Sequence, residues 1–145
     1  RPLRVDKMTL AALEATLRLY ADPNKARENI PLLQMTLIDL EELRERSSRL
    51  LARLQEHGIV ASLEESSSVL GGGSSPGVQL PSYNVVVTPT SSQSAQKLDS
   101  ALHQAETPVI ARIVRERLHF DLRTIRAEED EDLGSILLNV LKEDK

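Results

Sequence analysis

Apolar side chains recur at the spacing of an α-helix through the first part of the chain. The stripe in residues 10–20 predicts one helix, and Asp22-Pro23 predicts the start of a second, shorter helix. A leucine stripe in residues 37–54 predicts a third helix, with Thr36 as its N-terminal cap and Gly58 as its end. The chain therefore opens with a helical region.

The residues after Gly58 follow the alternating or β-branched pattern of strands, interrupted by two further helical stripes. The expected strands are residues 59–69, 83–88, 109–114 and 118–122, and the expected helices are residues 91–104 and 133–141. The link Arg115-Glu116 between the last two strands lacks the Asn-Gly chemistry of a tight hairpin, so its turn type stays open. This order predicts an α+β fold with a mostly antiparallel sheet and helices on one face.

These patterns divide the chain into a helical connection or arm, residues 1–57, and a small C-terminal α+β domain, residues 58–145. The leading helices either dock on that domain or pack against a separate one. The chain begins with Arg1 rather than Met, and we expect it to be a fragment of a longer protein.

The composition requires an aliphatic core. The chain has 145 residues, of which 40% are apolar, with one Phe, two Tyr and no Trp. It therefore offers no aromatic platform on which nucleic-acid bases could stack. A formal net charge of −4 argues against a domain whose main task is to grip phosphate backbones, although it leaves room for one short basic strip.

Side chains for metal binding or nucleophilic catalysis are sparse, and we expect no metal. The absence of cysteine excludes disulfides and thiolate nucleophiles and is compatible with a reducing, cytoplasmic setting. His57, His103 and His119 do not have metal-ligand spacing. The acidic run at residues 128–132 suits the start of the last helix better than a cation site. Nothing near Lys7 would desolvate it as a Schiff-base lysine requires.

A membrane partner is not expected either, since no apolar run approaches the roughly 20 residues that a membrane-spanning helix needs.

The glycine-rich stretch at residues 71–77 is the most unusual feature of the sequence. Its backbone N–H groups can approach a ligand closely, and Ser74 is its candidate ligand-binding side chain. Alternatively, the stretch is a flexible linker between two strands. The Gly-Lys-Ser/Thr sequence of a nucleotide phosphate loop does not follow it.

Three arginines are further candidates for binding an anion. Arg112 interrupts an apolar strand, where it binds a ligand carboxylate or phosphate, lies at a sheet edge, or pairs with an acid such as Asp121. Arg1 and Arg4 flank a proline and form either an anion-binding pair or solvated charges at a terminus.

Three segments together are similar to the bacterial selenocysteine synthase family, the L-seryl-tRNA(Sec) selenium transferases. Residues 1–20, R-P-L-R-V-D-K-M-T-L-A-A-L-E-A-T-L-R-L-Y, resemble the segment that follows the family's cofactor region. Residues 71–82, G-G-G-S-S-P-G-V-Q-L-P-S, resemble its G-G-G-S-x-P-x-x-x-L-P-S stretch, and residues 108–124 resemble its P-V-I-G-R-I…L-x-L-D-L-R-T. Ser75 and Ala111 depart from the family's more common Leu and Gly.

The resemblance implies the C-terminal part of a pyridoxal-phosphate enzyme of fold type I. Members of this family convert seryl-tRNA(Sec) to selenocysteinyl-tRNA(Sec), with selenophosphate as the selenium donor. The cofactor lysine is expected upstream of Arg1. This fragment is therefore expected to contain no catalytic residue, to bind no pyridoxal phosphate and to be inactive alone.

The resemblance also implies where ligands bind. Arg1 and Arg4 match the family's R-x-L-R, and together with Arg112 and Ser74 they are expected to bind substrate or an anion. Recognition of tRNA in the family is attributed largely to an N-terminal domain. A homo-oligomer in the cytoplasm is expected.

Two other interpretations remain open. One is a related pyridoxal-phosphate lyase that acts on a free amino acid or sugar acid, and the other is a non-enzymatic binding or oligomerisation module. A basic tRNA-binding extension upstream would favour the selenium enzyme. Burial of Leu10, Leu13 and Leu17 within this chain would favour the module.

Overall fold

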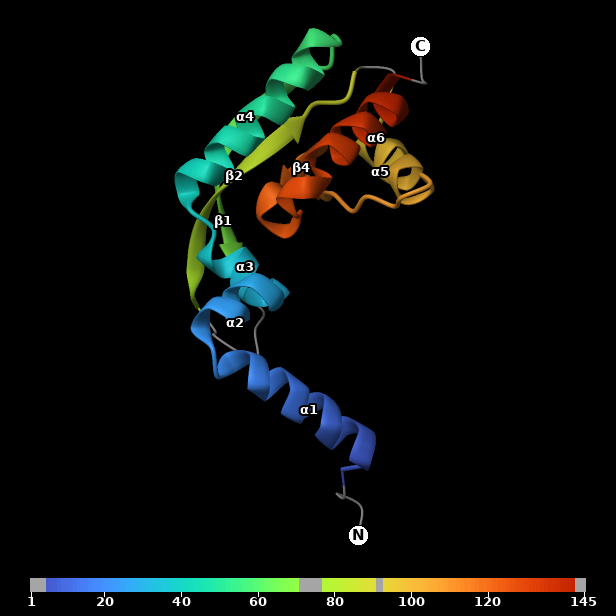
Figure 1. Cartoon of the computed structure of the whole chain (residues 1–145). Coiled ribbons are helices and arrows are strands. Elements are labelled where there is room, and N and C mark those ends of the chain that lie inside the picture. The colour runs from blue at the N-terminus through green and yellow to red at the C-terminus, as the bar shows by residue number, and fades with distance from the viewer. Residues whose placement is uncertain (1–4, 71–76, 91–92, 143–145) are drawn as a thin grey trace. The chain divides into compact units, whose positions relative to one another are not determined.

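The computed structural model describes residues 5–70, 77–90 and 93–142 (Figure 1). The chain divides into two compact units, Arg1–Ile38 and Asp39–Lys145. This division falls before helix α4 (Leu40–Glu56), whereas the sequence placed a domain boundary after it, between residues 57 and 58. The later boundary stays a prediction about the longer protein.

The described residues of the first unit form three helices, which are α1 (Lys7–Tyr20), α2 (Pro23–Asn29) and α3 (Pro31–Leu37). Asp6 caps α1 by accepting hydrogen bonds from two backbone N–H groups of its first turn, at 2.9 and 3.0 Å. No side chain of α1 is buried, and Leu10, Leu13 and Leu17 are 53–58% exposed. These leucines are therefore not buried within the chain, as the alternative of a self-contained binding or oligomerisation module would require.

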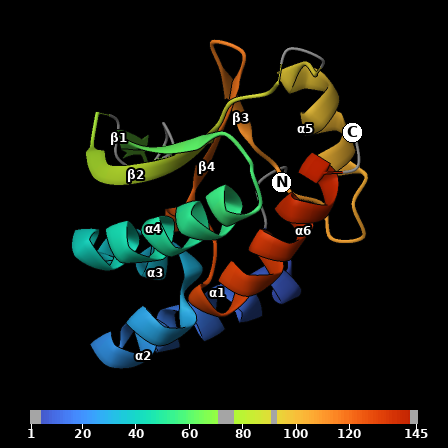
Figure 2. The ribbon, with the colours of Figure 1, turned by 90° about the horizontal axis from the view of Figure 1, so that it is seen from above.

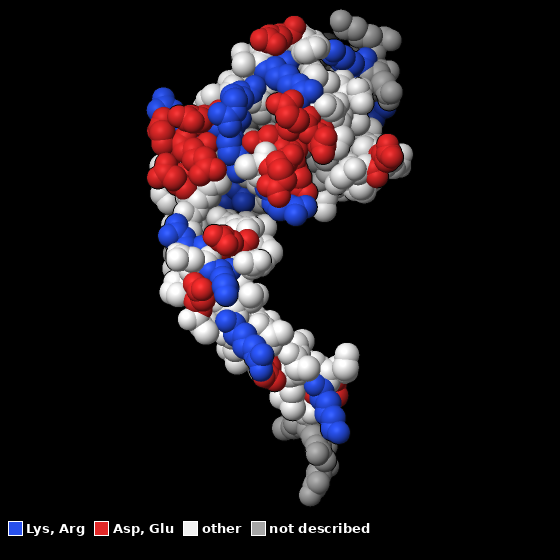
Figure 3. Space-filling model, in the orientation of Figure 1, with Lys and Arg blue, Asp and Glu red and all other residues white. Residues whose placement is uncertain are grey.

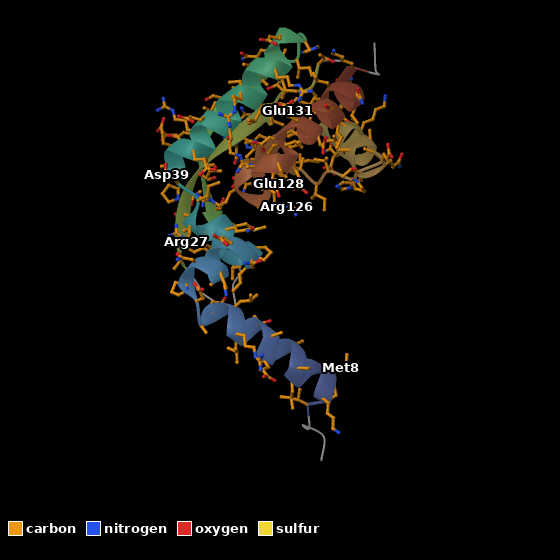
Figure 4. All side chains as sticks on the ribbon, viewed as in Figure 1. Met8, Arg27, Asp39, Arg126, Glu128 and Glu131 are labelled. Atoms are coloured by element: carbon orange, nitrogen blue, oxygen red, sulfur yellow. The ribbon has the colours of Figure 1, made fainter. Side chains whose placement is uncertain are left out.

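The start of α4 differs from the expected one. Asp39 caps this helix (Figure 4), with its carboxylate 2.8 and 3.3 Å from two backbone nitrogens of the first turn. The expectation that Thr36 is the cap is wrong, because Thr36 lies inside α3 and its hydroxyl donates to the Leu32 carbonyl at 2.9 Å. Gly58 ends α4 as predicted. Its φ of 77° is in the left-handed region that favours glycine.

The second unit contains one four-stranded antiparallel sheet in the order β1-β2-β4-β3. Its strands are β1 (Ala61–Val69), β2 (Gln79–Val87), β3 (Arg112–Val114) and β4 (Arg117–Asp121). β3 is shorter than the expected strand, because the Val109 N–H donates to the Leu102 carbonyl at 3.1 Å and holds this stretch at the end of the preceding helix. β2 begins four residues before the expected Tyr83.

Arg115 and Glu116 form the two-residue turn between β3 and β4, with φ values of 50° and 59°. Two successive positive φ values are those of a type I′ turn, whose twist matches antiparallel strands. The hairpin therefore has a tight two-residue type I′ turn, although its sequence is Arg-Glu and not the usual Asn-Gly.

Helices cover the apolar side of the sheet. They are α4, α5 (Ala95–His103) and α6 (Asp130–Lys142), and short 3-10 helices Leu122–Thr124 and Ala127–Glu129 precede α6. α4 packs against β1 and β2, and α6 packs against both α4 and α5 (Figure 2). The acidic run supplies the first turn of α6, as predicted. The unit is thus an α+β domain with an antiparallel sheet, as expected.

Alternation along β2 and β4 places Val85 and Val87 on the same face of the sheet as Leu118 and Phe120. Val85 pairs with Phe120 and Val87 with Leu118, and all four side chains are at most 4% exposed. The rest of the core comes mainly from leucines, which are Leu43, Leu50, Leu54, Leu98, Leu102, Leu122, Leu133 and Leu137. The core is aliphatic, as the composition required.

A buried ion pair joins α4 to α6. Arg46, only 3% exposed, donates to both carboxylate oxygens of Asp130 at 2.7 and 2.8 Å and to the Ile125 carbonyl at 2.8 Å. The bond to Asp130 raises the pKa of Arg46 above its ordinary value. Among the described helices, none is long and apolar enough to cross a membrane.

Candidate functional site

The face of the sheet opposite the core carries most of the polar side chains that the strands contribute. We call it the polar sheet face. Its main residues are Glu64, Ser66 and Ser68 of β1, Ser82 and Asn84 of β2, Arg112 of β3, and Arg117, His119 and Asp121 of β4. Residues at every second position of a strand point to the same side, so the antiparallel register aligns them across all four strands.

Asp121 is the hydrogen-bond acceptor at one end of this face. It accepts bonds from the hydroxyls of Ser68 and Ser82, the latter at 2.8 Å, and from the backbone N–H of Arg123 at 3.0 Å. The Arg123 side chain, 6% exposed, donates to the Pro81 carbonyl. These bonds tie β1, β2 and β4 together, so Asp121 does not serve as the partner of Arg112 that the sequence allowed.

A second hydrogen-bonded chain crosses the middle of the face. The Ser66 hydroxyl donates to the Asn84 side-chain oxygen at 2.9 Å, and the Asn84 amide lies 3.4 Å from Nδ1 of His119. An amide N–H that donates to Nδ1 leaves the proton of a neutral ring on Nε2. His119 is 9% exposed, and burial lowers its pKa below the ordinary value. His119 is therefore neutral near pH 7.

Glu64 and Arg117 form an ion pair that reaches across β2. A second contact between them measures 3.4 Å, from Nη2 of Arg117 to Oε2 of Glu64. The hydrogen bond from Arg117 lowers the pKa of Glu64. Both side chains are about one-third exposed, so the pair is partly solvated and its contribution to stability is small.

Of the site residues expected from the sequence, the structure describes only Arg112. It lies on the edge strand β3, is exposed, and faces His119 across the β3–β4 pair. This is the sheet-edge position that the sequence left open. Arg1, Arg4 and Ser74 lie outside the described residues.

Sequence reasoning missed the hydrogen-bonded set on the polar sheet face. His119 was considered only as a possible metal ligand, and Asn84 was not considered. One signal was available: Ser66 and Ser68, like His119 and Asp121, are two residues apart on a strand, which places each pair on one face. Which strands bring the pairs together could not be read from that spacing.

The described side chains suit neither a metal nor covalently held pyridoxal phosphate. No group of three or more potential metal ligands occurs among them. The lysines that the structure describes, which are Lys7, Lys25, Lys97 and Lys142, are all exposed. A lysine that reacts with a carbonyl at neutral pH needs a desolvated or positively charged surrounding that lowers its pKa. The described part of the chain therefore offers hydrogen-bonding side chains and exposed arginines, and its lysines lack such a surrounding.

Comparison with known proteins identifies the family. The model of the family described as "SelA: L-seryl-tRNA selenium transferase" matches residues 1–126. Proteins named L-seryl-tRNA(Sec) selenium transferase are 39% identical over 97% of this chain in Geotalea daltonii and 39% identical over 99% of it in Clostridium perfringens. A Clostridium botulinum protein of the same name is 40% identical over 86% of the chain.

The similarity covers nearly the whole chain but only part of each relative. The chain spans 31%, 30% and 27% of the lengths of the three proteins, respectively. Matches of this extent and identity establish that the chain belongs to the L-seryl-tRNA selenium transferase family.

Proposed function

We propose that the chain is the C-terminal part of a pyridoxal-phosphate-dependent transferase of fold type I. The whole protein converts seryl-tRNA(Sec) to selenocysteinyl-tRNA(Sec), with selenophosphate as the selenium donor. The observation that carries this proposal is 39% identity, over 97% of the chain, with a protein named for that transfer. Because the chain spans only 31% of that relative, the activity is proposed for the longer protein.

The cofactor in this proposal is held outside these 145 residues. The described lysines are exposed and do not fit the lysine that binds pyridoxal phosphate. The cofactor supplies the electron sink for removal of the seryl hydroxyl. This chain supplies none of that chemistry, and we propose that it is inactive alone.

The part proposed for this chain is to bind and orient anionic groups. Arg112 lies on the edge of a sheet whose neighbouring strands are joined by the Ser66–Asn84–His119 and Asp121 hydrogen bonds. Arg112 itself is carried by β3, which pairs with β4 over residues 112–114, and this pairing favours a defined place for its guanidinium. Arg1, Arg4 and Ser74 are proposed as further anion- or substrate-binding residues, following the family's motifs.

The family also supports a homo-oligomer, and a tRNA substrate favours the cytoplasm. A related lyase that acts on a free amino acid or sugar acid is the alternative enzyme. The exposed leucines of α1 argue against the alternative of a self-contained module, because such a module would bury them.

The proposal is tested with the whole protein and this chain side by side. Each is mixed with pyridoxal phosphate, seryl-tRNA(Sec) and selenophosphate, and selenocysteinyl-tRNA(Sec) is measured. We expect product only with the whole protein, and absorbance of a lysine-bound cofactor only with the whole protein. Free serine and a sugar acid are included as competing substrates.

Turnover of a free amino acid without conversion of seryl-tRNA(Sec) would replace the transferase by the lyase. A lysine-bound cofactor on this chain alone, at one equivalent, would contradict the assignment of the cofactor to the rest of the protein.

A further inference from the structure

The hairpin formed by β3, the Arg115-Glu116 turn and β4 has an unusual charge balance. We call residues 112–121 the β3–β4 hairpin. The Glu116 carboxylate accepts a hydrogen bond from Nε2 of Gln96 on α5, at 3.2 Å. Arg117 is engaged by Glu64. Within the part of the chain that the structure describes, Arg112 and Arg115 have no ion-pair partner.

Both of these arginines are open to solvent. Arg112 is exposed on the edge strand of the sheet, and Arg115 is exposed at the first position of the turn. Figure 2 shows the turn between β3 and β4 at the edge of the second unit, away from α4 and α6. A partner can therefore reach both guanidinium groups without opening the fold.

The backbone at the turn is unfavourable for arginine. Arg115 has a φ of 50°, in the left-handed region that glycine and asparagine adopt more easily. Glu116 has a φ of 59°, so both central residues share the backbone that a type I′ turn requires, and the turn presents the Arg115 side chain to solvent.

Many of the acidic side chains that give the chain its net charge lie on the helices of the second unit. Figure 3 shows them gathered on the helical side of the second unit, over the starts of α4 and α6. Those first turns contain Glu41 and Glu42 in α4 and Asp130, Glu131 and Asp132 in α6. The formal charge of −4 therefore does not describe the hairpin, in which three arginines face only two acidic residues, Glu116 and Asp121.

We propose that the β3–β4 hairpin is an RNA contact, in which Arg112 and Arg115 bind phosphates of the backbone. Guanidinium groups form bidentate bonds with phosphate oxygens, and two such contacts position an RNA without reading its sequence. The inference rests on the proposed function in one respect: the RNA is the tRNA substrate. The absence of aromatic residues from the hairpin tip fits backbone contact rather than base stacking.

The first experiment maps binding on the chain itself. The 15N-labelled chain is titrated with an unmodified tRNA transcript and followed by amide chemical shifts. We expect saturable shifts at the hairpin amides. The double variant Arg112→Gln/Arg115→Gln should bind on the order of 30-fold more weakly at 0.1 M salt, because each lost phosphate contact removes about 0.7–0.9 from the slope of log K against log salt.

A matched control separates contact from general charge. The double variant Arg44→Gln/Arg49→Gln removes the same charge from two exposed arginines of α4. We expect its RNA affinity and salt slope to stay within about twofold of the parent chain. Equal weakening by both double variants, or no shift of the hairpin amides at millimolar RNA, would overturn the proposal.

Inorganic phosphate is titrated in parallel. If phosphate gives the same shifts as RNA at equal phosphate concentration, the hairpin binds a small anion rather than RNA and the proposal fails.

The whole protein distinguishes this inference from the proposed function. In that protein the hairpin variant should raise KM for seryl-tRNA(Sec) and leave kcat nearly unchanged, since the arginines bind the substrate and do not react. Unchanged KM with normal selenium transfer would sink the hairpin contact and leave the function standing. Absence of transfer by the unaltered protein would sink the function, while the titration of the chain still decides whether the hairpin binds RNA.

Discussion

Replacing Asp130 with alanine tests whether the Arg46–Asp130 ion pair holds α6 on α4. The change removes two charge-assisted hydrogen bonds of 2.7 and 2.8 Å and leaves Arg46, which is 3% exposed, with only the Ile125 carbonyl at 2.8 Å. Removing one partner of a buried ion pair costs about 3–5 kcal/mol, because the remaining charge has lost both its partner and its water. The carboxylate of Asp130 is itself 20% exposed, so we expect the lower figure, about 3 kcal/mol.

Glu131 provides the matched control, because it stands beside Asp130 in the first turn of α6 and also pairs with an arginine of α4 (Figure 4). Its side chain is 89% exposed, so Glu131→Ala should cost less than about 1 kcal/mol. Both variants lose the same favourable negative charge at the start of the helix. The difference between their free energies of unfolding therefore reports the burial of the Arg46–Asp130 pair.

The free energy of unfolding is measured by urea titration, followed by circular dichroism, with the m-value as a check that the transition is unchanged. Adding Arg46→Met to Asp130→Ala should recover part of the loss, since no charge is then left buried without a partner. The reasoning fails if Asp130→Ala and Glu131→Ala destabilise the chain equally.

Three further predictions concern single residues. Because the pKa of His119 is lowered in the folded chain, the unfolded chain takes up the imidazole proton at a higher pH than the folded chain does. The free energy of unfolding should therefore fall as the pH drops from 7 through the ordinary His pKa of about 6.5. The variant His119→Asn should lose this dependence, as urea titrations at several pH values would show. Glu116→Gly should raise the free energy of unfolding by about 1 kcal/mol, because glycine adopts a φ of 59° without strain. Ser47→Ala should also stabilise the chain by about 1 kcal/mol, because the Ser47 hydroxyl is fully buried and has no hydrogen-bond partner among the described residues. The free energies of unfolding of Glu116→Gly and Ser47→Ala are measured by urea titration.

Each of these predictions has a contrary result. NMR titration of the His119 ring that gives a pKa at or above the ordinary value would contradict the neutral, buried imidazole. Loss of stability in Glu116→Gly would show that the hydrogen bond from Gln96 outweighs the turn strain. Loss of more than about 1 kcal/mol in Ser47→Ala would show that its hydroxyl has a partner.

Much of the second unit could be predicted from the sequence, because the signals are local. Gly58 ends α4 through its own backbone preference, and the acidic run begins α6 through its charge at the helix terminus. Errors occurred where a competing local bond decided the boundary. Thr36 is as good a cap as Asp39 by residue type, and only the hydroxyl bond of Thr36 inside α3 separates the two.

The candidate site was predicted less well than the fold. Arg112 was recognised because a charge in an apolar strand is a visible exception, although its exposed edge position was one of several alternatives. His119 and Asn84 gave no comparable signal. They lie 35 residues apart, and each becomes informative only beside the other.

The sequence by itself indicated most of the helices and strands, the aliphatic core and the family of the selenium transferases, but not helix α3 or the ends of β2 and β3. These follow from side-chain periodicity and from motifs, both of which are properties of neighbouring residues. Tertiary structure alone decided the strand order β1-β2-β4-β3 and therefore which polar side chains share a face. Strand pairing joins distant segments, and alternation along one strand does not specify its neighbour or its register. For this reason, only the tertiary structure shows that Glu64 binds Arg117 and Gln96 binds Glu116, which leaves Arg112 and Arg115 as the exposed charges of the β3–β4 hairpin.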